Sequence, residues 1–201
     1  MSTELQPHID WNYSGKPDEF FGTGATTAER SLVWGLGLLG TALITWTWWT
    51  ASPGWAWWQY AIALLLTLDV IGGVTANALN SCKRFYHAPL KAEETGIARF
   101  AKNHLAFTLL HIHPILIGLI FGSMNWAYGL FWYVALVGCV LIILRLPLYL
   151  QRPAALGLIM IAILLNYYFV APVVHFEWFI PALFLKIVYG HTVREEPYRP
   201  S

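Results

Sequence analysis

Long apolar runs alternate with short polar segments along most of this chain. Runs long enough to cross about 30 Å of hydrocarbon, which takes about 20 helical residues, occupy residues 31–50, 56–80, 101–122, 126–150, 153–172 and 174–191. The pattern predicts an all-α, polytopic integral membrane protein folded as a six-span transmembrane helical bundle. In this division a polar segment at residues 1–30 precedes the membrane domain at 31–191, and a charged tail at 192–201 follows it.

Composition favours the membrane and excludes an ordinary soluble globule. Hydrophobic residues make up 57% of the chain and charged residues 11%, whereas soluble domains have roughly 45–50% and 25%. The net charge of +1 provides no basic face for a nucleic acid. The expected partners are therefore the lipid bilayer and a lipid-like substrate, and the sequence leaves the oligomeric state open.

The positions of Lys and Arg predict the orientation, because short loops rich in them stay in the cytoplasm. They gather between the second and third spans, between the fourth and fifth, and in the C-terminal tail, whereas residues 51–55, 123–125 and 172–174 contain none. We therefore expect both termini in the cytoplasm and the chain in the plasma membrane, or the inner membrane of a bacterium. The first thirty residues lack the pattern of a cleavable signal peptide, so the first span is expected to start insertion.

Polar side chains inside the spans recur at helical spacing, although a charge at the centre of a membrane helix costs about 2.5–3.5 kcal/mol. On the second span, one face carries Asp69, Gly73, Asn77, Asn80, Arg84 and His87. On the third span His104, Thr108 and His111 share a face, and His113 is expected to point away from it. Counting depth at 1.5 Å per residue brings Asp69 level with His111 near the midplane.

These faces predict a polar pocket open to the cytoplasmic leaflet. The predicted acid–base residues are Asp69, His111 and His104. The predicted substrate-binding residues, suited to a phosphate or carboxylate headgroup, are Asn77, Asn80, Arg84, Arg145 and Lys186. A purely structural alternative is that Arg145 and Lys186 extend to the headgroups while the two amides bond across helices.

Histidine supplies the candidate metal ligands. The set is His87, His104, His111 and His191, with Asp69 as a ligand or as the partner that orients an imidazole. These residue types suit zinc or iron. The sequence has no HExxH or HxxxH pair, so the ligands must come from several helices. Cys82 and Cys139 are too few and too far apart for a disulfide framework or a CxxC metal site.

The preferred interpretation is a small membrane-embedded enzyme acting on a lipid-like or amphipathic substrate, with or without a divalent metal. One alternative is a small proton- or ion-coupled carrier, in which the ionisable side chains form a path, although no inverted repeat supports it. Others are a haem protein using two of the histidines at equal depth, His87, His104 and His191, or a structural subunit of a membrane complex.

The C-terminal quarter resembles membrane methyltransferases of the isoprenylcysteine carboxyl methyltransferase type. The resemblance rests on Gln151, Arg152 and Pro153 before a helical hairpin and on Glu195 and Glu196 after it. That family has an Arg-His-Pro box, whose central histidine is missing here. The resemblance implies binding of S-adenosylmethionine.

Overall fold

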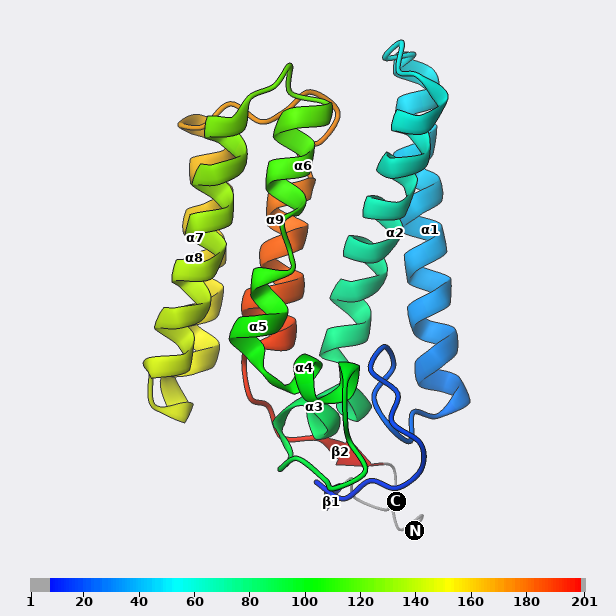
Figure 1. Ribbon diagram of the computed structural model, residues 1–201, viewed down its shortest axis with the longest axis vertical. Coiled ribbons are helices and arrows are strands. Elements are labelled where there is room, and N and C mark those ends of the chain that lie inside the picture. The colour runs from blue at the N-terminus through cyan, green and yellow to red at the C-terminus, as the bar shows by residue number, and fades with distance from the viewer. Residues whose placement is uncertain (1–7, 200–201) are drawn as a thin grey trace, which may run out of the picture.

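The computed structural model describes residues 8–199 and is almost entirely helical (Figure 1). Four helices are long and apolar enough to cross a membrane: α1 (Thr27–Ala51), α2 (Trp57–Ala78), α7 (Trp126–Arg145) and α8 (Leu148–Tyr168). Two columns of shorter helices accompany them, α5 (His104–Leu109) with α6 (His113–Ile120), and α9 (Phe179–Phe184) with the π-helical segment η1 (Leu185–His191). The chain is a multi-pass helical protein of membrane type. The count of six spans stays a prediction, because neither column is one long helix.

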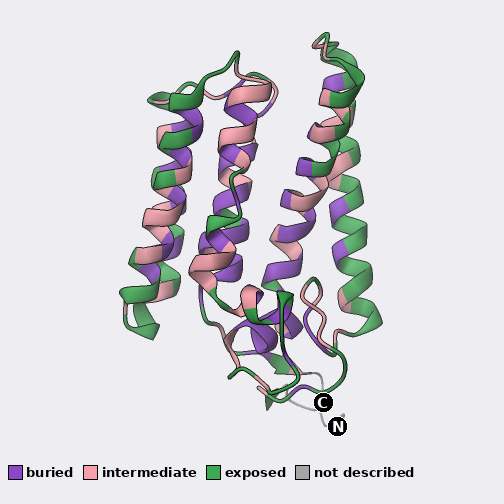
Figure 2. Ribbon diagram, viewed as in Figure 1, coloured by how far each residue is buried: buried purple, intermediate pink, exposed green. Residues whose placement is uncertain are grey.

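The outward faces of the long helices are apolar and uncovered. On α1, Leu39, Leu43 and Trp46 are 57%, 59% and 66% exposed, and Figure 2 shows exposed residues along much of this helix. The core lies on the inner faces, where Trp132 of α7 contacts Phe184 of α9. Soluble proteins rarely expose contiguous apolar patches of more than a few hundred Å², so these outer faces fit a lipid environment.

Helices α1 and α2 pack closely as an antiparallel pair. A capping box starts α1: the Thr26 hydroxyl accepts the N–H of Glu29 at 3.1 Å, and the Glu29 carboxylate accepts the N–H of Thr26 at 2.8 Å. The helix therefore begins at Thr27 and not at residue 31. Farther along, a Cβ on Gly37 would lie 3.2 Å from the Cα of Gly72, so the glycines allow the two backbones to approach.

The polar segments gather at one end of the bundle (Figure 1). Helices α3 (Asn80–His87) and α4 (Ile97–Lys102) lie there, and strand β1 (His8–Ile9) pairs antiparallel with β2 (Tyr198–Arg199). The turn between α7 and α8 is at the same end, so the three basic segments share one side of the bundle, as the sequence predicts. Which side of a membrane this end faces remains a prediction.

The polar end contains a buried charge cluster around Glu94. Its carboxylate binds Lys102 Nζ at 2.6 Å, the Tyr13 hydroxyl at 2.7 Å and the N–H of Lys91 at 2.9 Å. Burial alone would raise the pKa of Glu94, but these hydrogen bonds outweigh it and hold the pKa below the ordinary value. The cluster ties the N-terminal segment to the loop that precedes α4.

Two predicted helices are interrupted. The second span was expected to continue one face from Asp69 to His87, but α2 ends at Ala78, because Leu79 is extended with ψ of 144°. The third predicted span is divided between α5 and α6. Both breaks change which polar side chains meet, because counting along one helical face holds only within a continuous helix.

Candidate functional site

A carboxylate, an ammonium group and two imidazoles meet inside the bundle, and we call Asp69, His111, His113 and Lys186 the Asp69 group. Lys186 Nζ donates to Asp69 Oδ2 at 2.6 Å. His113 Nε2 lies 3.4 Å from the same oxygen. Asp69, His111 and His113 each offer one ligand atom, and these atoms all lie within 4.8 Å of one another. The group therefore has the composition and spacing of a candidate metal site.

His113 belongs to this group because the chain breaks before Pro114. Proline has no N–H, and its ring collides with the carbonyl four residues earlier in a continuous helix. After α5 the N–H of His111 donates to Thr108 O at 2.9 Å and that of Ile112 to Leu110 O at 2.8 Å, and α6 then starts at His113. The expectation that His113 points away from His111 was wrong, because it assumed an uninterrupted helix.

Lys186 reaches the group by passing over Gly73 of α2. A Cβ on Gly73 would collide with the Lys186 side chain, whose Cδ would be only 2.7 Å away. The lysine side chain is 4% exposed. The sequence placed Lys186 in one layer with Arg145, whereas its ammonium group lies at Asp69, because the missing side chain at Gly73 opens a path to the interior. Binding of a headgroup by Lys186 stays a prediction.

His111 is close to Asp69, as predicted, but the direct partners of Asp69 are Lys186 and His113. The Nδ1 of His111 is instead 2.8 Å from the carbonyl oxygen of Phe107. Since a carbonyl only accepts, this bond makes Nδ1 the donor and leaves the lone pair on Nε2. A backbone partner of this kind commonly orients a histidine that binds metal.

A cavity of about 320 Å³ opens beside the Asp69 group. Its lining includes Asp69, His111 and Lys186, together with Asn77 and Tyr86. Asp18, Glu19 and Phe20 of the N-terminal segment also line it, a contribution that the sequence did not predict. The Asp69 side chain remains 43% exposed, so the carboxylate is accessible from the cavity.

The predicted substrate-binding residues separate in the structure. Asn77 lines the cavity and donates to Lys186 O at 3.1 Å. Beyond the break at Leu79, the Asn80 Oδ1 accepts the N–H of Tyr198 at 3.1 Å, and the Arg84 guanidinium lies 3.4 Å from Tyr198 O. Arg145 is exposed at the end of α7. These last three residues do not line the cavity, so the structure does not bring the predicted set together, and their role in substrate binding stays a prediction.

His87, His104 and His191 form a second cluster, which we call the three-histidine cluster. The ring centres of His87 and His104 are 4.6 Å apart, and those of His104 and His191 are 4.8 Å apart. Phe107 separates this cluster from the Asp69 group, because its ring centre lies 4.0 Å from that of His191 and 4.7 Å from that of His111. The four histidines predicted as one ligand set therefore lie in two neighbouring clusters.

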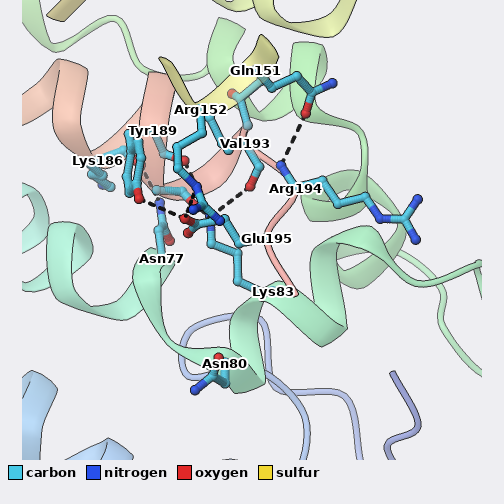
Figure 3. Close-up of polar contacts among 12 residues, drawn as sticks. Asn77, Asn80, Lys83, Gln151, Arg152, Lys186, Tyr189, Val193, Arg194 and Glu195 are labelled. Atoms are coloured by element: carbon cyan, nitrogen blue, oxygen red, sulfur yellow. Dashed lines mark hydrogen bonds and ion pairs between the residues drawn. The ribbon is translucent and has the colours of Figure 1, made fainter. Parts of the chain in front are cut away.

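A network around Glu195 fixes the end of η1 (Figure 3). Lys83 Nζ donates to the carbonyls of Gly190 at 2.6 Å and Val193 at 2.8 Å, and it pairs with Glu195 at 3.4 Å. Arg152 Nε and the Tyr189 hydroxyl also contact this carboxylate, at 3.3 and 2.7 Å. Burial lowers the pKa of Lys83 to about 8, and Glu195 opposes that shift. A lysine at the carbonyl end stabilises a helix terminus, here the one that carries His191.

Sequence reasoning missed the roles of His113, Gly73 and Tyr86. Pro114 was the available signal for His113, because a proline inside a predicted span indicates a break and with it a change of face.

Comparisons with protein-family models, with curated proteins and with solved structures found no match to this chain. Its function is therefore inferred from the sites alone.

Proposed function

We propose that this protein is a membrane-embedded, metal-dependent enzyme that acts on an amphipathic substrate with an anionic headgroup. The observation that carries the proposal is the convergence of Asp69, His111 and His113 within 4.8 Å beside an accessible cavity. Two imidazoles and one carboxylate are ligands that zinc and iron accept. Three protein ligands leave a coordination position for water or substrate, as catalytic metal sites require.

The charge of the Asp69 group favours an anionic substrate. Lys186 already neutralises Asp69, so a divalent cation bound there gives the site excess positive charge. Burying that charge is costly unless an anion compensates it. A phosphate or carboxylate headgroup in the cavity would supply the compensation, and the apolar part of the substrate would remain in the bilayer.

Each residue of the site has a role in this proposal. Asp69 and the two histidines would hold the metal, and the chemistry it would supply is polarisation of a substrate oxygen or activation of water. Lys186 stays hydrogen-bonded to one carboxylate oxygen and presents a cation beside the metal. Asn77 holds the backbone of η1 through Lys186 O, which keeps the ammonium over Gly73.

The pairing of Asp69 with Lys186 also favours a second function, a proton-coupled carrier. Ionisable pairs inside membrane helices occur in proton relays. Sealed vesicles containing the purified protein separate the two functions. Solute uptake that follows a pH gradient and disappears in Asp69→Asn supports the carrier, whereas metal-dependent turnover without uptake supports the enzyme.

The direct test is the metal content of the protein purified in detergent. We expect zinc or iron to copurify, and we expect His113→Ala and Asp69→Asn to lose the metal that is bound at the Asp69 group. His175→Asn is the matched control, because His175 is only partly buried, lies in neither cluster and has a positive φ that Asn also tolerates. Replacing Cys82 and Cys139 together by Ala should leave the metal content unchanged. Retention of all metal by both Asp69-group variants would contradict the proposal.

A further inference from the structure

The three-histidine cluster has unsatisfied polar atoms at its centre. Within residues 8–199, neither ring nitrogen of His191 has a hydrogen-bond partner, and the residue is 0% exposed. Nδ1 of His104 and Nε2 of His87 are likewise buried without a partner in that part of the chain. Buried polar groups in proteins are nearly always hydrogen-bonded, so orphaned atoms indicate a missing water or ion.

The surroundings of His191 keep its ring in place. Phe107 stacks on it at 4.0 Å and 19°, and Tyr86 meets it edge-on at 4.4 Å. Lys83 caps the carbonyls of residues 190 and 193 on either side of it. Burial has therefore removed the water that would hydrate the two ring nitrogens of His191, and no protein group in the described chain takes its place.

We infer that His87, His104 and His191 bind a second divalent transition-metal ion of the zinc class, separate from the Asp69 group. In a tetrahedral site with metal–nitrogen bonds of about 2.0–2.1 Å, neighbouring imidazole ring centres lie about 5 Å apart. The observed spacings of 4.6 and 4.8 Å agree with that value. His104 contacts both other rings, but among the described residues no ring contact joins His87 to His191, and the ligand nitrogens of the three do not converge as the ligand atoms of the Asp69 group do. Binding therefore requires the His87 and His191 side chains to turn toward one point.

Neutral imidazoles and an open groove suit a bound metal, and the cationic Lys83, Arg99 and Lys102 nearby require that an anion accompany it. Desolvation disfavours the charged form of a buried histidine, and the neutral ring is the form that ligates metal. His104 also lines a groove of about 520 Å³ at the polar end, together with Arg99, Lys102 and Asn103. This groove provides an entry path, which a credible metal site requires.

The same contacts exclude a haem between these rings. A macrocycle cannot enter between imidazoles whose centres are 4.6–4.8 Å apart and whose outer faces touch aromatic rings. Ordered water remains the competing occupant, because a buried water binds two to four polar groups. Metal and water differ in a measurable way, since water leaves the protein free of metal.

The test counts zinc bound by chelator-treated, full-length protein in detergent. We expect about two equivalents for the wild type and for the His175→Asn control. His104→Asn and His191→Asn should each keep only the equivalent that belongs to the Asp69 group, whereas His113→Ala should keep only the equivalent that belongs to the three-histidine cluster. Thermal unfolding of each variant without metal checks that it is folded.

Each outcome decides one site independently of the other. If the wild type binds one equivalent that disappears in His113→Ala but survives in His191→Asn, the second site does not exist and the proposed enzyme site stands. If the single equivalent shows the opposite dependence, the three-histidine cluster stands and the proposed function fails. If folded wild-type protein binds no zinc, the second site fails, and the proposed function fails with it when ferrous iron does not bind either. His87→Asn supplies an independent variant at the cluster should His191→Asn not fold.

Discussion

The ion pair between Asp69 and Lys186 is expected to respond unequally to removal of its two members. The Lys186 side chain is 4% exposed and that of Asp69 43%. Replacing Asp69 by Asn keeps the shape and an acceptor but leaves a buried ammonium without its counter-charge. Replacing Lys186 by Met leaves a carboxylate that can still be hydrated from the cavity and that has His113 beside it.

The expected losses in free energy of unfolding follow from these exposed fractions. Removing one partner of a buried pair costs about 3–5 kcal/mol, and Asp69→Asn should fall near the lower end, at about 3 kcal/mol. Lys186→Met should cost about 1 kcal/mol, in the range of single polar contacts inside membrane proteins. In the double variant Asp69→Asn with Lys186→Met both charges are gone, so its loss should be smaller than that of Asp69→Asn alone.

Equilibrium unfolding in mixed detergent, with a chelator present, measures these free energies without a contribution from bound metal. The matched control is Leu65→Ala, because Leu65 is 68% exposed on the outer face of the same helix and its truncation should leave the free energy of unfolding nearly unchanged. Our reasoning fails if Lys186→Met costs as much as Asp69→Asn, or if the two single losses simply add in the double variant.

Three further outcomes are expected. Gly73→Ala should destabilise the wild type by about 1 kcal/mol, because it displaces the Lys186 side chain from its path, and the same change should have almost no effect on unfolding in a Lys186→Ala background. Pro114→Ala should allow the helix to continue and turn His113 away from the carboxylate, so zinc content should fall although no ligand is replaced. Because the pKa of Glu94 is lowered by folding, its stabilisation is complete above the ordinary value of 4.5 and is lost as the pH falls through the folded-state pKa. Acid unfolding of Glu94→Gln should therefore depend less on pH than that of the wild type.

The helical class and the positions of the apolar columns were predictable, because about 20 apolar residues in sequence leave few alternatives to a membrane helix. The breaks were harder to predict. Nothing about the type of residue 79 marks the end of α2, so Asn80 and Arg84 were assigned to the wrong face. Pro114 did mark a break, but the direction of the chain after it depends on packing against α7.

The residue types of the candidate site could be predicted from the sequence more readily than the contacts between them. The cost of an intramembrane carboxylate singled out Asp69, and the structure places this residue beside His111 and His113. Its partner could not be deduced, because Lys186 lies 117 residues away and its path depends on the absence of one side chain at Gly73. The common depth of His87, His104 and His191 was deduced from residue counting, and these three do meet.

The pairing of β1 with β2 has a consequence for synthesis. Asp10 and Arg199 bind each other across 189 residues of sequence, so strand β1 has no partner until residues 198–199 leave the ribosome. Contacts between such distant segments form late, because the entropy of closing the intervening loop must first be overcome. The N-terminal segment therefore keeps an unpaired strand edge while all the described helices are being made. A nascent chain cut short before residue 198 would retain those helices yet expose that edge for pairing with another molecule.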